Sequence, residues 1–151
     1  MRRVLVLGAM IASITFGGAA MAAEVQVKML NKGTEGAMVF EPSLVTIQPG
    51  DTVKFVAPDK GHNVEAIEGM IPDGAKPFAG KINEELTVTF DEPGVYGVKC
   101  KPHYAMGMVA MIVVGKPANE GKAASVVHPG RAKQVFATLF GRAATSIASA
   151  K

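Results

Sequence analysis

The sequence has few of the features that mark several large protein classes. It contains a single cysteine in 151 residues, which excludes an internal disulfide. It has no internal repeat and no low-complexity segment, and no paired carboxylates or second cluster of metal ligands indicate an enzyme's substrate site. The apolar run from Val4 to Phe16 is too short and wrongly flanked for a stable membrane span. A disulfide scaffold, a repeat protein and a membrane-spanning protein are therefore not expected.

The N-terminus has the pattern of a secretory signal peptide. A basic start is followed by the apolar run and then by Ala20-Met21-Ala22, an A-x-A cleavage site. We therefore predict a signal peptide over residues 1–22 and an exported mature chain from Ala23, with no membrane attachment. Loss of Arg2 and Arg3 lowers the formal net charge from +3 to near +1, and so small a charge argues against nucleic-acid binding.

The lone cysteine has a histidine and a methionine close to it in the sequence. Cys100 comes three residues before His103 and eight before Met108, and His62 lies far upstream. Thiolate, imidazole and thioether are the ligands of a blue-copper centre, in which the soft sulfurs favour Cu(I) and the imidazoles serve either oxidation state. A thiol in an oxidising compartment is also at risk unless a metal occupies it. The spacing predicts one type 1 copper ion, held by a short loop and a remote histidine.

Two other interpretations of this motif need weighing. A free cysteine is most often a small buried hydrophobe, and nine methionines make a chance neighbour conceivable. Zinc is the nearest rival metal, but structural zinc sites prefer several cysteines and do not use methionine. The complete C-x2-H-x4-M pattern between two predicted strands favours copper.

The rest of the chain predicts short strands separated by turns. The expected strands are Val25–Met29, Ala37–Phe40, Leu44–Ile47, Asp51–Val56, Asn63–Ile67, Leu86–Phe90, Val95–Cys100 and Val109–Val114. The stretch from Glu68 to Gly80 lacks periodicity and indicates a long surface loop. This succession of short strands and turns predicts an all-β Greek-key sandwich over residues 23–115.

The tail after Val114 has a different character. Residues 116–151 predict a helical extension, with a short helix within Ala118–Val126 and a longer one beyond Pro129-Gly130. The apolar stripe of the longer helix is expected to pack on the sandwich. It consists of Val135, Phe136, Leu139 and Phe140. His128 has no neighbouring soft ligand, and we expect it at the surface.

Several segments resemble the pseudoazurins of the cupredoxin family, which are small blue-copper electron carriers. The resemblance is carried by Met29–Gly33, Gly36–Pro42, Pro49–Val53, Asp59–Glu65, Gly69–Ala75, Lys81–Glu84, Pro93–Cys100 and Pro102–Tyr104. It implies that the four copper ligands are His62, Cys100, His103 and Met108. It also implies that Asn63 ties the upstream histidine loop to the cysteine loop. Pro102, which lacks an N–H, would give the cysteine sulfur no second hydrogen bond.

The same resemblance implies a docking surface for redox partners. Met38, Pro102 and Met106 match an apolar patch around the edge of His103. Four lysines near the ligand-bearing loops predict a basic ring that steers an acidic partner, namely Lys32, Lys60, Lys99 and Lys101. The chain departs from the family at Ala105, where a glycine is expected, and at Lys101, where a small neutral residue is expected. Neither departure touches a ligand.

These observations predict a monomeric periplasmic carrier and not an enzyme. The resemblance implies one-electron transfer to a partner such as copper nitrite reductase from a c-type cytochrome donor, through brief docking. A copper storage or delivery protein would use the same soft ligands, so it is the alternative. Four protein ligands leave no open coordination position for a substrate, which argues against catalysis.

Overall fold

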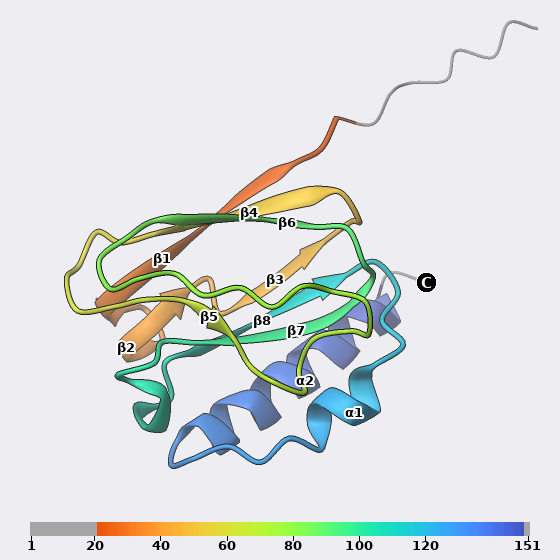
Figure 1. Cartoon of the computed structure of the whole chain (residues 1–151). Coiled ribbons are helices and arrows are strands. Elements are labelled where there is room, and N and C mark those ends of the chain that lie inside the picture. The colour runs from red at the N-terminus through yellow and green to blue at the C-terminus, as the bar shows by residue number, and fades with distance from the viewer. Residues whose placement is uncertain (1–20, 150–151) are drawn as a thin grey trace, which may run out of the picture.

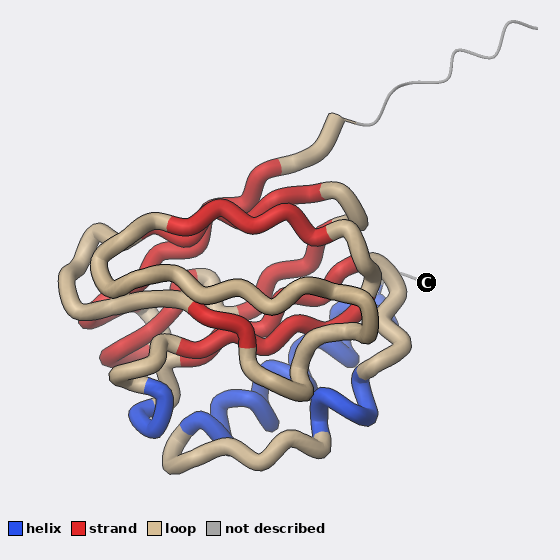
Figure 2. The backbone as a smooth tube through the Cα atoms, viewed as in Figure 1, coloured by secondary structure: helices blue, strands red, loops and turns tan. Residues whose placement is uncertain are grey.

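The structure, a computed structural model, describes residues 21–149. Residues 1–20, and with them most of the predicted signal peptide, lie outside the described residues. Eight strands form two four-stranded sheets (Figures 1 and 2). The first sheet has the order β2 (Gly36–Glu41), β1 (Glu24–Gly33), β4 (Asp51–Val56), β6 (Leu86–Phe90). The second has the order β3 (Leu44–Ile47), β8 (Val109–Val114), β7 (Gly94–Lys99), β5 (Glu65–Ala66).

Both sheets are mixed, and helices cover one of them. β1 pairs in parallel with β4 and β3 with β8, while the other named strand pairs are antiparallel. A 3₁₀ turn, η1 (Tyr104–Met106), lies between β7 and β8, and α1 (Glu120–Ala124) and α2 (Ala132–Ser149) follow β8. Figure 1 shows both α-helices on the side of β7 and β8 that faces away from the first sheet. The predicted sandwich with a C-terminal helical extension is confirmed.

Alternating side chains build a core between the two sheets. Val27 and Met29 of β1 and Phe55 of β4 lie in the same buried cluster as Val98 of β7 and Ile112 of β8. Cys100 and Met108 also belong to this cluster, so the predicted ligand loop grows directly out of the core.

A second core lies under the helices. Met111 and Val113 of β8 cluster with Phe136 and Leu139 of α2. β8 is buried at every position because one face meets the first sheet and the other meets α2.

The structure corrects two expectations about the loops. His128, expected at the surface, is only 9% exposed, because it contacts Tyr104 and Phe136. The stretch from Glu68 to Gly80 is irregular as predicted, but it is not simply a surface loop. Met70 is fully buried and lies against Gly97, where an added Cβ would come 2.5 Å from the Met70 sulfur.

The expected strand over Asn63–Ile67 shrinks to the two residues of β5. Its flanks use other hydrogen bonds: the Val64 carbonyl accepts from the Gly80 N–H, and the Ile67 N–H donates to the Gly97 carbonyl. This short strand leaves the chain around His62 free to turn toward the cysteine loop.

Candidate metal centre

Three of the predicted ligands converge at one end of the sandwich. The Cys100 Sγ lies 3.7 Å from the Nδ1 of His62 and 3.5 Å from the Nδ1 of His103. The two Nδ1 atoms are 3.2 Å apart. A single metal ion bonded to each atom at roughly 2.0–2.3 Å would bridge distances of this size. Thiolate and two imidazoles are the donor set of the strong plane of a blue-copper site.

The tautomer of His62 suits this arrangement. Its Nε2 lies 2.9 Å from the Oδ1 of Asn31, which can only accept a hydrogen bond. The proton therefore resides on Nε2, and Nδ1 presents its lone pair to the sulfur and to His103. Burial lowers the pKa of His62, with the nearby His103 acting in the same direction and Asp59 opposing it, so the imidazole stays neutral.

A tight loop brings His103 and Met108 next to Cys100. The His103 N–H donates to the Cys100 carbonyl at 3.2 Å, and the Met108 N–H donates to the His103 carbonyl at 3.2 Å. The Cys100 N–H closes the loop by donating to the Met108 carbonyl at 3.0 Å. Gly107 makes the turn with a φ of 92°, a conformation that favours glycine. Met108 is fully buried, which agrees with a ligand shielded from water.

Burial of the Cys100 thiol and two nearby backbone N–H groups have opposite effects on its pKa. Burial raises the pKa of the Cys100 thiol, whereas the backbone N–H groups of Asn63 and His103 lower it. Asn63 also accepts a hydrogen bond from the Lys101 N–H through its Oδ1, at 2.8 Å. The histidine loop and the cysteine loop are thus joined through Asn63, the contact that the resemblance implied.

The predicted docking residues differ in exposure. Lys32, Lys60 and Lys101 are exposed, as is Pro102, and Met106 is 48% exposed beside the partly exposed His103. Met38 is half-buried against the core. Lys99 is engaged elsewhere: its ammonium lies 3.4 Å from Glu65 and 5.0 Å from the centre of the Tyr104 ring.

Comparison with known proteins agrees with this geometry. Residues 27–115 match the family of copper-binding proteins of the plastocyanin/azurin type. The pseudoazurin of Methylorubrum extorquens is 53% identical over 115 residues, which cover 76% of this chain and 78% of that protein. The pseudoazurin of Paracoccus pantotrophus is 52% identical over 114 residues, 75% of this chain and 79% of that one. The chain belongs to the pseudoazurins.

Solved structures show the same similarity for this pseudoazurin. The crystal structure of pseudoazurin from Methylobacterium extorquens AM1 superposes with a TM-score of 0.77 at 52% identity, covering 79% of this chain and 98% of that chain. Native pseudoazurin from Hyphomicrobium denitrificans gives a TM-score of 0.76 at 39% identity, covering 79% and 97%. The chain is thus a blue-copper electron carrier by family. His62, Cys100, His103 and Met108 form its type 1 copper-like site.

Sequence reasoning missed Asn31, which sets the His62 tautomer. One signal was available: Val27 and Met29 alternate into the core, and Asn31 continues the same phase of β1. It also missed Asn83, whose N–H donates to the His62 carbonyl at 2.8 Å and whose Oδ1 accepts from Gly61. No local pattern marks Asn83.

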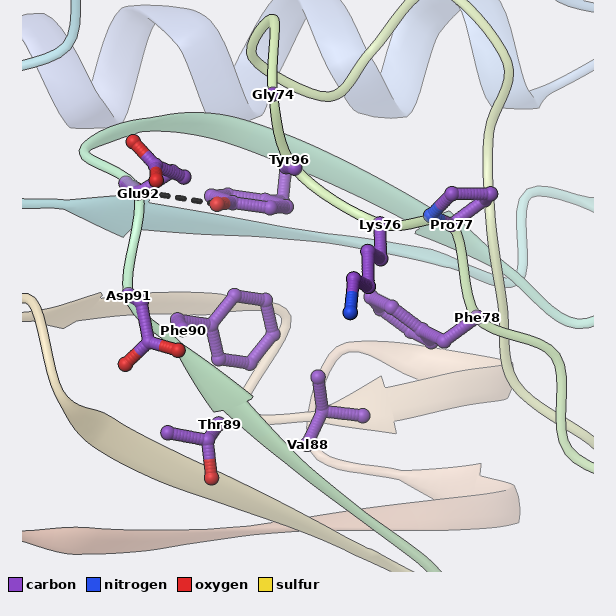
Figure 3. A pocket seen from close by; sticks show the side chains of 11 residues that line it. Gly74, Lys76, Pro77, Phe78, Val88, Thr89, Phe90, Asp91, Glu92 and Tyr96 are labelled. Carbon is purple, nitrogen blue, oxygen red and sulfur yellow. Dashed lines mark hydrogen bonds between the residues drawn. The ribbon is translucent and has the colours of Figure 1, made fainter.

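A separate pocket lies at the opposite end of β7 from Cys100 (Figure 3). Phe78, Phe90 and Tyr96 line it, and the Tyr96 hydroxyl donates to the Glu92 carbonyl at 2.7 Å. None of the predicted site residues lines this pocket. Among residues 21–149, neither α-helix has both the length and the hydropathy that crossing a membrane demands.

Proposed function

We propose that this pseudoazurin is a monomeric periplasmic electron shuttle, not an enzyme, that takes one electron from a c-type cytochrome and passes it to copper nitrite reductase in denitrification. The convergence of the Cys100 sulfur with the Nδ1 atoms of His62 and His103 carries the proposal. Copper bound there supplies the Cu(I)/Cu(II) couple. The signal-peptide pattern over residues 1–22 supports export, with the mature chain starting at Ala23.

The surroundings of the site favour a carrier over a copper storage or delivery protein. His62, Cys100 and Met108 are fully buried, so a metal held by them would be difficult to exchange. Met29, Met70 and Met111 are also fully buried in the cores. Their sulfurs are therefore not exposed ligands along which copper could be passed. A rigid, buried site keeps its geometry in both oxidation states, which is what a carrier needs.

Docking would use the face around His103. The exposed Met106 and Pro102 give an apolar contact next to the partly exposed imidazole, through which an electron could pass between the buried site and a partner. Exposed Lys32, Lys60 and Lys101 would steer an acidic partner to this face. We expect a small interface, below roughly 1,200 Å², because the encounter must be brief.

The first experiment compares the copper-loaded mature chain with Cys100→Ser. We expect an intense visible thiolate-to-copper band that bleaches reversibly with reductant and is absent from the variant. A colourless protein, or a colour that survives Cys100→Ser, would show that the thiolate is not a ligand.

The partner is tested separately. Reduced protein is mixed with copper nitrite reductase and nitrite, and the return of the visible band is followed by stopped flow. Reoxidation supports the shuttle. Absence of reoxidation, with the blue band itself intact, would reject this partner and leave the carrier assignment standing.

A further inference from the structure

A hydrogen bond joins the ligand loop to the C-terminal extension. Tyr104, which directly follows the ligand His103, places its hydroxyl 2.6 Å from the Nδ1 of His128. The His128 ring stacks on Phe136 of α2, with centroids 4.3 Å apart and planes inclined by 29°. Which of the two rings supplies the proton of this hydrogen bond depends on the tautomer of His128.

Further contacts join the extension to the same short stretch of loop. The Arg131 N–H donates to the Ala105 carbonyl at 2.9 Å. Gly130 packs against that carbonyl so closely that an added Cβ would lie 2.3 Å from its oxygen. A Cβ on Gly107 would lie 3.1 Å from Val135. Figure 1 shows η1 and the start of α2 at the same end of the molecule.

Tyr104 is also held from the other side. The Lys99 ammonium lies 5.0 Å from the centre of the Tyr104 ring, a cation–π contact, and pairs with Glu65 of β5. The ring is thus fixed between the second sheet and the extension. Within residues 21–149, His128 is the hydrogen-bond partner of the Tyr104 hydroxyl.

Backbone hydrogen bonds within the ligand loop connect Tyr104 to the ligands His103 and Met108. Met106 and Met108 both donate backbone hydrogen bonds to the His103 carbonyl, and Gly107 donates to the Tyr104 carbonyl. A displacement of the Tyr104 backbone would therefore act on His103 and Met108 together. Second-sphere contacts that orient ligands tune the properties of a bound metal.

We propose that His128 is a positioning residue of the copper site, which holds His103 and Met108 in place through its hydrogen bond to Tyr104. The proposal rests on the proposed blue-copper function. It assigns a role in the redox site to the C-terminal extension, beyond covering the sheet.

The test uses three variants of the mature protein. Tyr104→Phe keeps the ring but removes the hydroxyl. His128→Leu keeps the apolar volume but removes the ring nitrogen that faces Tyr104. His128→Asn restores a hydrogen-bonding group, because its side-chain amide can donate or accept at nearly the same distance from the backbone as the Nδ1 of histidine. Val127→Ala, at a neighbouring side chain that is 90% exposed, is the matched control.

Two readouts are measured on each protein. In the copper-free protein, amide hydrogen exchange of Met106, Gly107 and Met108 should become roughly five- to tenfold faster in Tyr104→Phe and His128→Leu, as expected for a lost hydrogen bond. In the copper-loaded protein, the reduction potential should shift in the same direction in both, with no further shift in the double variant. His128→Asn and Val127→Ala should resemble the wild type.

The outcomes separate this proposal from the function on which it rests. If Tyr104→Phe and His128→Leu match the wild type in exchange and in potential, the positioning role is wrong. If His128→Asn behaves like His128→Leu, the hydrogen bond to Tyr104 is not what matters, and the proposal also fails. If wild-type protein shows no blue band while the exchange rates change as expected, the blue-copper function fails and the loop-positioning contact stands.

Discussion

Asn63 connects three segments around the copper-like site through its side chain. Its Oδ1 accepts from the Lys101 N–H at 2.8 Å, and its Nδ2 donates to the Gly80 carbonyl at 3.1 Å. The residue is 4% exposed, so water cannot readily replace these partners. The amide thus stabilises the loop of His62 in the position where its Nδ1 faces Cys100.

We expect Asn63→Ala to lower the free energy of unfolding by about 1–3 kcal/mol, because it leaves buried polar groups without partners. The measurement is urea unfolding of the copper-free protein. Gln48→Ala, at an exposed turn position, should change stability by less than about 0.5 kcal/mol. Equal stability of Asn63→Ala and wild type would show that the amide joins the loops without stabilising them.

Tyr96 should make the stability sensitive to alkaline pH. Burial, followed by the nearby carboxylates of Glu92 and Asp91, raises the pKa of Tyr96 from 10.0 to about 12. Between these values the folded chain keeps a proton that the unfolded chain has lost, so stability falls as pH rises through this window. Across the whole window the free energy of unfolding falls by roughly 2–3 kcal/mol.

The pH effect is tested with Tyr96→Phe. This variant loses the hydrogen bond to the Glu92 carbonyl, which lowers the free energy of unfolding by about 1 kcal/mol at neutral pH. It has no phenol to titrate, so its stability does not fall further at alkaline pH. Its stability should therefore approach or exceed that of the wild type near pH 12. Urea unfolding of both proteins across the alkaline range checks this, and parallel pH curves would contradict it.

At the scale of the elements, β8 and α2 depend on one another. All six residues of β8 are apolar and buried, and they alternate between the inter-sheet core and the face under α2. Without α2, Met111 and Val113 would be exposed to solvent on the outer face of the second sheet. The helix therefore completes the burial of the strand that follows the ligand loop.

Phe136→Ala should lower the free energy of unfolding by about 3–5 kcal/mol, the usual result of deleting a buried aromatic ring. Phe136 is 2% exposed and stacks on His128, so the change also weakens the contact beside Tyr104. Denaturant unfolding of the copper-free protein measures the loss. Gln134→Ala, exposed on the same helix, serves as control, and a loss below about 1 kcal/mol for Phe136→Ala would mean that α2 contributes little.

At the scale of the whole molecule, the site lies at one end, where loops from both sheets meet the C-terminal extension. Its buried ligands lie behind an exposed apolar contact at Met106. The exposed lysines of the proposed docking face belong to three separate loops or strand ends. Lys99 differs from them because Glu65 already pairs its charge.

This difference gives a prediction about partner encounter. We expect Lys60→Gln and Lys101→Gln each to slow the bimolecular reaction with an acidic redox partner a few-fold at low salt, and the effect to vanish near 1 M salt, where screening extends over about 3 Å. Lys99→Gln should have a smaller effect. Stopped-flow rates as a function of ionic strength measure this, with Lys116→Gln, beyond the opposite end of β8, as control. Equal effects of all four variants would argue against a directed basic ring.

Features that depend on near neighbours could be predicted from the sequence. The bounds of β3, β4, β6 and β8 match the predicted strands, because alternation and turn residues act within a few positions. The C-x2-H-x4-M spacing identified the clustered ligands for the same reason. His62 was found by its residue type and by resemblance, since spacing carries no information across a separation of 38 positions.

How distant segments meet became visible in the folded chain alone. It placed Asn31 of β1 against His62, paired Lys99 with Glu65, and buried His128 between Tyr104 and Phe136. A polar residue between Val127 and Pro129 looks like a surface residue, because local sequence does not state what will pack over it. Burial and partners are set by the contacts that the whole chain makes, and those contacts appear only when the sheets and the extension come together.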